Sequence, residues 1–183
     1  MYPFSTLMCP QRFDEQSYQH ILHTMAAFHL SITSLGASET KTELKTLLEP
    51  HSISTAIYQD LSQLDTHFDI SQVQPLSVGS DDIHSLLALA YVWAGSSMGA
   101  QILLKWLRRN EASLPNAYYQ KMAQQSGKWL QVKLFISQQL QNDEIQAETI
   151  IRYANKWFEA IIHETQHTCV SVPTDTRKHA APL

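Results

Sequence analysis

The segment Tyr91–Leu107, with the sequence YVWAGSSMGAQILLKWL, constrains the fold of this 183-residue chain more than any other stretch. It contains no proline, and its only charged side chain is Lys105. From Leu86 onward the apolar residues recur at steps of three and four, which predicts an α-helix with at least one buried face. The residues in this pattern are Leu86, Leu87, Ala90, Tyr91, Ala94, Met98, Ile102, Leu103 and Trp106. A long apolar helix in the middle of the chain is therefore expected.

Two glycines, Gly95 and Gly99, lie four residues apart on one face of this expected helix. Glycine inside a helix costs about 1 kcal/mol relative to alanine. The pair therefore indicates that something large approaches the backbone or that the helix bends. A closely crossing second helix is the simpler explanation, and a bound ligand is the alternative. A membrane span is not expected, because charged residues flank the segment and Ser, Gln and Gly interrupt it.

The other periodic segments predict further helices and no strands, so the expected fold class is all-α. Asp14 and Glu15 open the first helix, which Gly36 ends. Later helices are expected over residues 39–48, 53–68, 115–142 and 143–167, with Pro50 as a stop and Gly127 as a break. The long apolar helix is expected to have Asp81 or Asp82 as its cap and to end near Asn110. The residues expected to face inward on the last two are Trp129, Val132, Leu134, Phe135, Leu140, Ile150, Ile151, Ala154, Trp157, Phe158, Ile161 and Ile162.

Length and charge narrow the class of protein. A chain of this size can bury one core, so we expect a single helical domain over residues 1–168 and a flexible tail over 169–183. The net charge of −4 gives no indication of a nucleic-acid partner. Cys9 and Cys169 are too few for a disulfide framework. The first residues lack the basic and apolar regions of a signal peptide, so the expected location is the cytoplasm.

One short motif predicts metal chemistry. His163-Glu164-Thr165-Gln166-His167 matches the His-Glu-x-x-His pattern of zinc hydrolases, in which two imidazoles one turn apart hold zinc and the glutamate activates water. In a chain with 9 His the pattern also arises by chance, and a third ligand is needed. Only Asp175 and His179 follow it. A zinc hydrolase is the weakest of the functional alternatives.

The residues from Tyr91 to Gln101 resemble the distal-helix signature of bacterial heme oxygenases, a Tyr-Val-x-x-Gly-Ser-x-x-Gly-Gly-Gln pattern. Residues 3–30, 127–140 and 150–162 also resemble segments of that family, and about nine tenths of the chain fits its overall pattern. It implies a heme oxygenase-like helical bundle in which this helix lies over the heme plane. The family's glycines let the backbone approach the iron-bound oxygen, where a side chain would collide.

The resemblance also implies an activity. Heme is both substrate and prosthetic group of a heme oxygenase, which consumes O2 and electrons from a reductase and releases biliverdin, CO and ferrous iron. By this resemblance Gly95, Ser96 and Gly99 form the distal catalytic face, and Ser96 supports a water network that donates hydrogen bonds. Tyr91 and Met98 pack around the macrocycle.

Two lysines complete the site that the resemblance implies. Lys128 and Lys133 lie on the helix that carries the partners of the heme propionates in that family. Most exposed lysines are simply solvated, so this pairing needs a geometric test.

The chain departs from the family pattern at two places. Ala100 stands where the second glycine of the final pair is expected. The family's proximal heme ligand is a His about a dozen residues before the segment that resembles Pro3-Phe4-Ser5, whereas the first His of this chain is His20. No metal ligand is therefore assigned, and His20 and His23 are the only weak substitutes on that part of the chain.

Two interpretations follow from the missing ligand. In the first, the given start lies downstream of the true one and a first helix is left out. In the second, the protein keeps the scaffold without turnover, as a heme-binding or interaction module. A bundle without that helix would expose an apolar wall, which suits a partner or self-association.

Overall fold

The computed structural model describes residues 14–35, 38–64, 72–109 and 113–170, with side chains described as far as residue 166. All regular secondary structure in the described ranges is helical, which confirms the all-α class and a bundle of one domain. The helices are α1 (Glu15–Thr33), α2 (Glu39–Leu48), α3 (Pro50–Gln63), α4 (Ile83–Leu107), α5 (Ala117–Gln124), the short 3-10 helix η2 (Gln125–Gly127), α6 (Lys128–Gln139) and α7 (Ala147–Val170).

Side-chain caps fix where three of these helices begin. The carboxylate of Asp14 accepts a hydrogen bond from the backbone N–H of Ser17 at 2.8 Å, and Asp82 accepts one from Ser85 at 2.9 Å. The hydroxyl of Ser38 does the same for Lys41. Each cap satisfies an N–H group that has no partner within the first turn of its helix. The predicted starts of α1, α2 and α4 are therefore confirmed.

Pro50 has a different role from the one predicted. It does end α2, but it is also the first residue of α3, three residues before the predicted start at Ile53. Proline suits this position because its missing N–H would have no helical partner. The turn of the chain falls on Glu49, whose backbone is left-handed with a φ of 47°. The helix α3 ends at Gln63, and the predicted last position, Phe68, lies outside the described residues.

The boundaries around α6 and α7 also differ from the prediction. The helix α6 ends at Gln139, and α7 begins at Ala147 rather than Asp143. Asn142 occupies the connection, where its side chain accepts from the N–H of Glu144 at 3.0 Å and its carbonyl accepts from the N–H of Ile145 at 2.9 Å. These bonds stabilise a turn in place of a helix. The break at Gly127 is confirmed as the end of η2.

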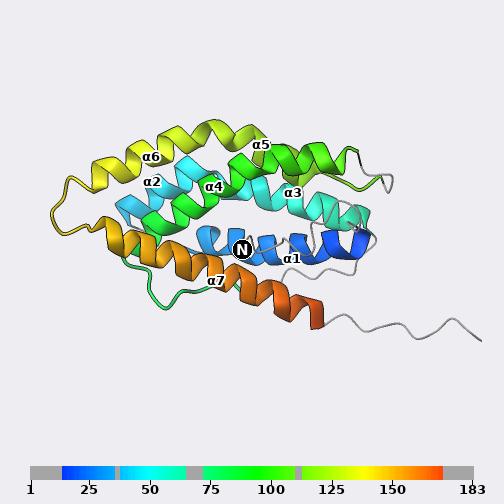
Figure 1. Ribbon diagram of the computed structural model, residues 1–183, viewed down its shortest axis with the longest axis horizontal. Helices are drawn as coiled ribbons and strands as arrows, with labels where there is room; N and C mark the ends of the chain where they lie inside the picture. The colour runs from blue at the N-terminus through cyan, green and yellow to red at the C-terminus, as the bar shows by residue number, and fades with distance from the viewer. Residues whose placement is uncertain (1–13, 36–37, 65–71, 110–112, 171–183) are drawn as a thin grey trace, which may run out of the picture.

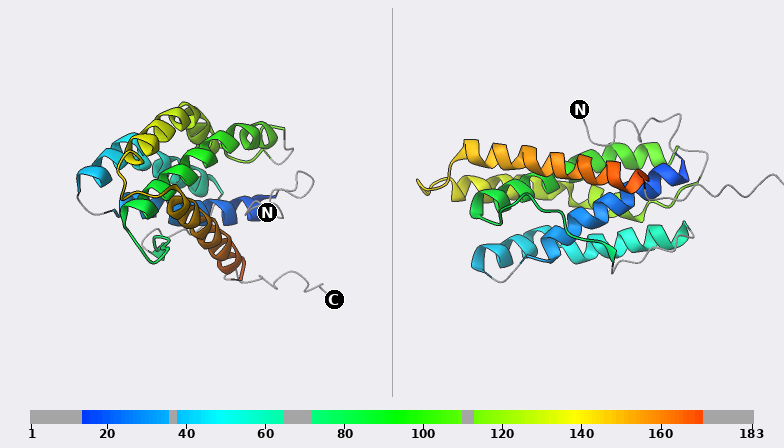
Figure 2. Two further views of the ribbon diagram at one scale, coloured as in Figure 1. Left: turned by 60° about the vertical axis from the view of Figure 1, so that its left-hand side comes forward. Right: turned by 90° about the horizontal axis from the view of Figure 1, so that it is seen from below.

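The helix α4 lies at the centre of the bundle. It packs against α5, α6 and α7, whereas α1 packs against α3 and α7. Figure 1 shows α6 and α7 on opposite sides of α4, and the left view of Figure 2 shows the same arrangement. Because α6 and α7 both contact α4 and diverge from each other, one side of α4 remains uncovered along the bundle by the described helices.

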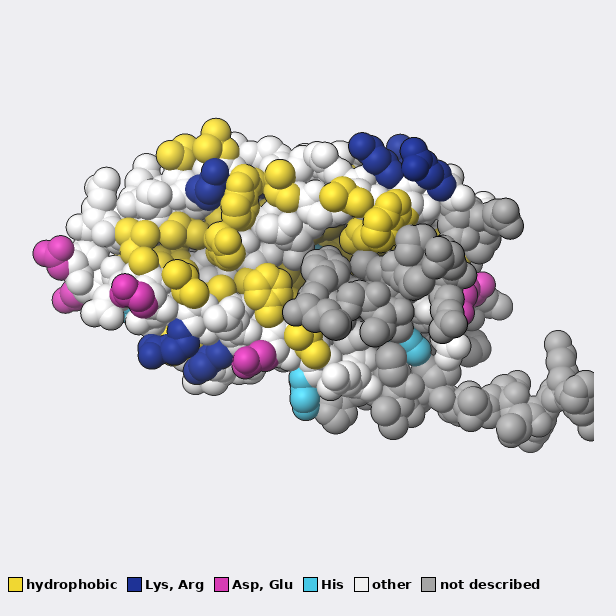
Figure 3. Space-filling model, viewed as in Figure 1, with side chains coloured by type: hydrophobic (Ala, Val, Ile, Leu, Met, Phe, Trp, Pro, Cys, Tyr) yellow, Lys and Arg dark blue, Asp and Glu magenta, His cyan; other side chains and the backbone are white. Residues whose placement is uncertain are grey.

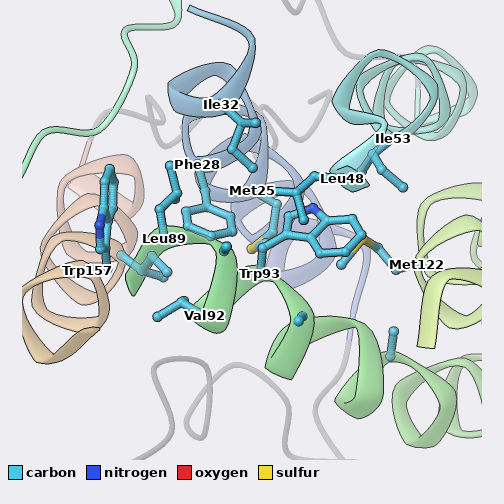
Figure 4. Close-up of a cluster of buried hydrophobic side chains, with 14 of the residues drawn as sticks. Met25, Phe28, Ile32, Leu48, Ile53, Leu89, Val92, Trp93, Met122 and Trp157 are labelled. Carbon is cyan, nitrogen blue, oxygen red and sulfur yellow. The ribbon is translucent and has the colours of Figure 1, made fainter. Parts of the chain in front are cut away.

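The opposite side of α4 enters the core. Trp93 is fully buried and lies among Met25, Leu48 and Met122, while Leu89 lies beside Phe28 (Figure 4). The indole N–H of Trp157 donates to the carbonyl oxygen of Ser85 at 3.2 Å. This hydrogen bond links α7 to the first turn of α4. Burying side chains of this size stabilises the fold by roughly 1.5–3 kcal/mol each.

Asp60 joins three helices through one buried carboxylate. It accepts from the Tyr18 hydroxyl at 2.6 Å and from the backbone N–H groups of Ala117 and Tyr118 at 2.8 and 2.9 Å. The bonds link α3 to α1 and to the start of α5, so that Tyr118 and Tyr119 pack as a buried pair. Burial raises the pKa of Asp60, although the three hydrogen bonds oppose this shift.

Candidate functional site

The uncovered side of α4 carries a continuous apolar row, which we call the α4 stripe. Its members are three or four residues apart and so lie above one another on one side of the helix. They are Tyr91, Gly95, Met98, Ile102 and Trp106, with Gly99 beside them. The four large side chains are 43–56% exposed, although the sequence pattern groups them with buried positions. The prediction of a buried face holds for Leu86, Leu87, Ala90 and Ala94 instead.

The two glycines of the stripe have open space above them. A Cβ atom built on Gly95 or Gly99 meets no described atom within 4 Å. Neither glycine has the positive φ that would require the residue for backbone reasons. Within the described part of the chain, close helix crossing therefore does not explain them. The absence of side chains at these two turns leaves the backbone exposed at Gly95 and partly exposed at Gly99.

Helix α6 forms one border of the stripe. The rings of Tyr91 and Trp129 are 5.3 Å apart, and the Lys133 ammonium lies 5.4 Å from the centre of the Trp129 ring. Leu130 and Leu134 lie further out on α6 and are 59% and 55% exposed, so the inward position predicted for Leu134 is wrong. This border combines aromatic surface with one cation.

Helix α7 forms the other border. Trp157 and Ile161 are buried as predicted, but Ile151 is 61% exposed and Phe158 is 36% exposed. The inward position predicted for these last two residues is therefore wrong. Figure 3 shows the molecule from the same side as Figure 1. Apolar side chains gather in a band across this face, and Lys and Arg side chains lie around the band.

The predicted site residues differ in how far the structure groups them. Tyr91, Gly95, Met98 and Gly99 share the stripe. Ser96 lies to one side, half-buried, and its hydroxyl donates to the Val92 carbonyl at 2.9 Å. Its role in a water network stays a prediction.

The two predicted lysines lie in different surroundings. The ammonium of Lys128 donates to the Leu47 carbonyl and to the Glu49 carboxylate, both at 2.7 Å. This pairing lowers the pKa of Glu49 and holds α6 against the junction of α2 and α3. Lys133 instead lies over Trp129 beside the stripe. Of the two predicted propionate partners, Lys133 is the better placed.

His20 and His23, the substitute ligands, lie on α1. This helix packs on α3 and α7 and contributes Met25 and Phe28 to the Trp93 side of α4, opposite the stripe (Figure 4). Burial lowers the pKa of both imidazoles. On the same helix His29 is fully buried, its Nε2 atom lies 3.4 Å from the Tyr118 hydroxyl, and burial lowers its pKa to about 3. The structure does not bring α1 to the stripe.

The zinc motif gains no third ligand among the described side chains. His163 is exposed and Glu164 half-buried on α7, whereas the side chain of His167 lies outside the described set. Within that set no three His, Cys, Asp or Glu residues come together as a metal site. The motif stays a prediction.

Among the described helices, α4 is long and apolar enough to cross a membrane by length and composition. Its most apolar window is 56% buried inside the bundle. A core helix of a globular bundle has the same properties, so length and composition do not assign a span.

With this geometry established, the chain can be compared with known proteins. No family model, curated protein or solved structure matches it. The resemblance to heme oxygenases consequently depends on the residues quoted above, and chiefly on those of α4.

Two features of the structure were not predicted from the sequence. The exposure of the stripe was missed because α4 is apolar on almost every side, so periodicity alone cannot say which side is covered. The buried role of Asp60 was also missed, although Asp60 interrupts the apolar row that Ile57, Leu61 and Leu64 form on α3. An acid within such a row is the signal that identifies a buried carboxylate with partners.

Proposed function

We propose that the chain is a heme-binding protein of the heme oxygenase type, with the heme plane against the first half of the α4 stripe. The observation that supports this most is the open space above Gly95 and Gly99 within an otherwise apolar row. Two helix-breaking residues that contact no described side chain cost stability without a packing reason. A flat ligand at van der Waals distance from the backbone supplies one.

The surroundings suit a planar amphiphile with carboxylates. Tyr91, Met98 and the Trp129 ring offer apolar and polarisable contacts, as binding sites for cofactors generally do. The Lys133 ammonium stands at the edge of this surface, where it would pair with a propionate. The residues therefore fit the macrocycle and one of its carboxylates.

The fit does not extend to the iron. Of the described histidines, His84 shares the side of the stripe, but its Nε2 atom accepts from the backbone N–H of Gln146 at 3.2 Å. The others lie on α1, α3 and α7. None of the described residues is thus assigned as an axial ligand. Heme supplies O2 activation in the heme oxygenases that the chain resembles, and this chain's stripe would orient the macrocycle and exclude water from one of its faces.

Absorption spectroscopy with added hemin tests the proposal. Stoichiometric binding with a shifted Soret band is expected for the full chain, and a reductase and O2 are then supplied to test whether biliverdin bands appear. Binding without biliverdin would assign the chain as a heme carrier or sensor. Absence of any saturable hemin binding would contradict the proposal.

A further inference from the structure

The charges of the chain are unevenly distributed, and the second half of α4 lies in the basic part. Residues 83–142 contain six Lys and Arg residues against a single acid, Glu111, so this stretch is net +5 although the whole chain is net −4. Lys128 is neutralised by Glu49. Three of the five other cations, Lys105, Arg108 and Arg109, lie at the end of α4, and Glu111 follows them in the sequence.

A groove at this end of α4 holds two of these cations. It has a volume of about 380 Å³ and lies between α4 and α5, lined by Gln101, Leu104, Lys105, Arg108, Gln120, Ala123 and Gln124. Lys105 and Arg108 are exposed, and no ion pair within the described ranges engages either of them. These two exposed cations, beside amide side chains, provide donors for an anionic group.

The adjoining side of the same helix is apolar. Ile102 is 56% exposed and Trp106 is 43% exposed, and both alternate along α4 with the residues that line the groove. A tryptophan at the edge of an apolar surface, next to lysine and arginine, is typical of residues that lie at the boundary of a lipid bilayer. Cations and apolar side chains are thus adjacent on one exposed end of one helix.

We propose that this end of α4 docks on an anionic phospholipid bilayer. Lys105 and Arg108 bind headgroup phosphates in the groove, while Ile102 and Trp106 enter the boundary between headgroups and acyl chains. The molecule lies on the membrane and does not span it. A second copy of the chain fits this surface less well, because a symmetric contact would bring the Lys105, Arg108 and Arg109 clusters of both copies together.

Co-sedimentation of the full chain with vesicles tests the docking. Binding is expected to vesicles of phosphatidylcholine containing one quarter phosphatidylglycerol and not to phosphatidylcholine alone, and it is expected to weaken as NaCl is raised. Equal binding to both vesicle types, or binding to neither, would overturn the proposal. So would a chain that dimerises through this surface and ignores both vesicles.

Paired charge variants locate the contact. A cation near an anionic leaflet contributes about 1 kcal/mol, so Lys105→Gln with Arg108→Gln is expected to weaken vesicle binding by ~30-fold. The matched control is Arg152→Gln with Lys156→Gln on α7, which makes the same change in net charge away from the groove. Equal weakening by both pairs would show a general charge effect and contradict a site at α4.

Fluorescence tests the apolar part. Brominated lipid in the anionic vesicles is expected to quench Trp106, and Trp106→Phe is expected to remove most of the quenching. Trp93 and Trp157 are buried in the core, and the half-buried Trp129 lies against Tyr91, in the other half of the stripe. Unchanged quenching in this variant would overturn insertion at this end. Heme binding is assigned to the half of the stripe around Gly95. Hemin titration therefore tests the proposed function and vesicle binding tests the membrane docking, and either proposal can be contradicted without the other.

Discussion

The two sides of α4 show how one apolar helix can serve two purposes. On one side Trp93 and Leu89 enter a close-packed core, where each side chain is surrounded by other helices. On the other, Met98 and Ile102 are about half exposed, and two glycines present bare backbone to open space. Packing explains the first side completely. The two glycines on the second side lower helix stability, and no described atom packs against them, which is the pattern expected of a surface kept for a ligand.

The largest expected difference between the two sides is in stability. Trp93→Ala should lower the free energy of unfolding by about 3–5 kcal/mol, because the cavity it leaves cannot be filled by solvent without cost. Trp106→Ala, the matched change on the stripe, should lower it by less than about 1 kcal/mol. Denaturant unfolding of the two variants measures both values. Similar losses would mean that the stripe is as well packed as the core.

The pH dependence of stability probes the core side through His29. Its pKa is about 3 in the fold and near 6.5 when unfolded, so the unfolded chain takes up the proton first as the pH falls. The stability supplied by neutral His29 is therefore complete above pH 6.5 and is lost toward pH 3, by about 1.4 kcal/mol per unit.

His29→Leu should remove that component of the slope when unfolding is measured between pH 7 and pH 5. His51→Gln, which removes an imidazole from the surface instead of the core, is measured beside it as the matched variant. Because Asp60 titrates in both proteins, the comparison between variant and wild type isolates the imidazole. Identical slopes in His29→Leu and wild type would contradict a buried neutral His29.

Substitution of the glycines is expected to stabilise the protein slightly, whereas Trp93→Ala destabilises it. Gly95→Ala and Gly99→Ala should each raise the free energy of unfolding by up to about 1 kcal/mol, because alanine favours the helix and its Cβ meets open space. Thermal or denaturant unfolding measures the gain. A loss of stability in either variant would show that another segment packs against these glycines, as a helix crossing requires.

The smallest expected effect concerns an exposed member of the stripe. Met98→Gln should change the free energy of unfolding by no more than about 0.5 kcal/mol, since the side chain is 47% exposed. Its hemin affinity should nevertheless fall, because an apolar contact to the macrocycle is replaced by an amide. Parallel unfolding and hemin titrations distinguish a role of Met98 in hemin binding from a role in core packing. A large stability loss with unchanged affinity would assign Met98 to the core.

The sequence predicts the fold better than it predicts the site, and for a physical reason. Caps such as Asp14 and Asp82 are local, so the starts of α1 and α4 can be recognised from neighbouring residues. The side of a helix that is covered depends on which distant segments pack there. Hence Ile151 and Phe158 fit an apolar period yet are exposed, and the partner that draws Lys128 away from the stripe is Glu49, which is remote in sequence.

The central claim is that a flat ligand, and not another helix, accounts for the bare backbone of the α4 stripe. Hemin titration of the Gly95→Leu, Gly99→Leu double variant tests it most directly. Leucine favours the helix, so folding should be retained, while affinity for hemin should fall by at least ~10-fold because two side chains would occupy the space of the macrocycle. Asn155→Leu, an exposed change on α7, should bind as the wild type does. Undiminished hemin binding by the double variant would contradict the account.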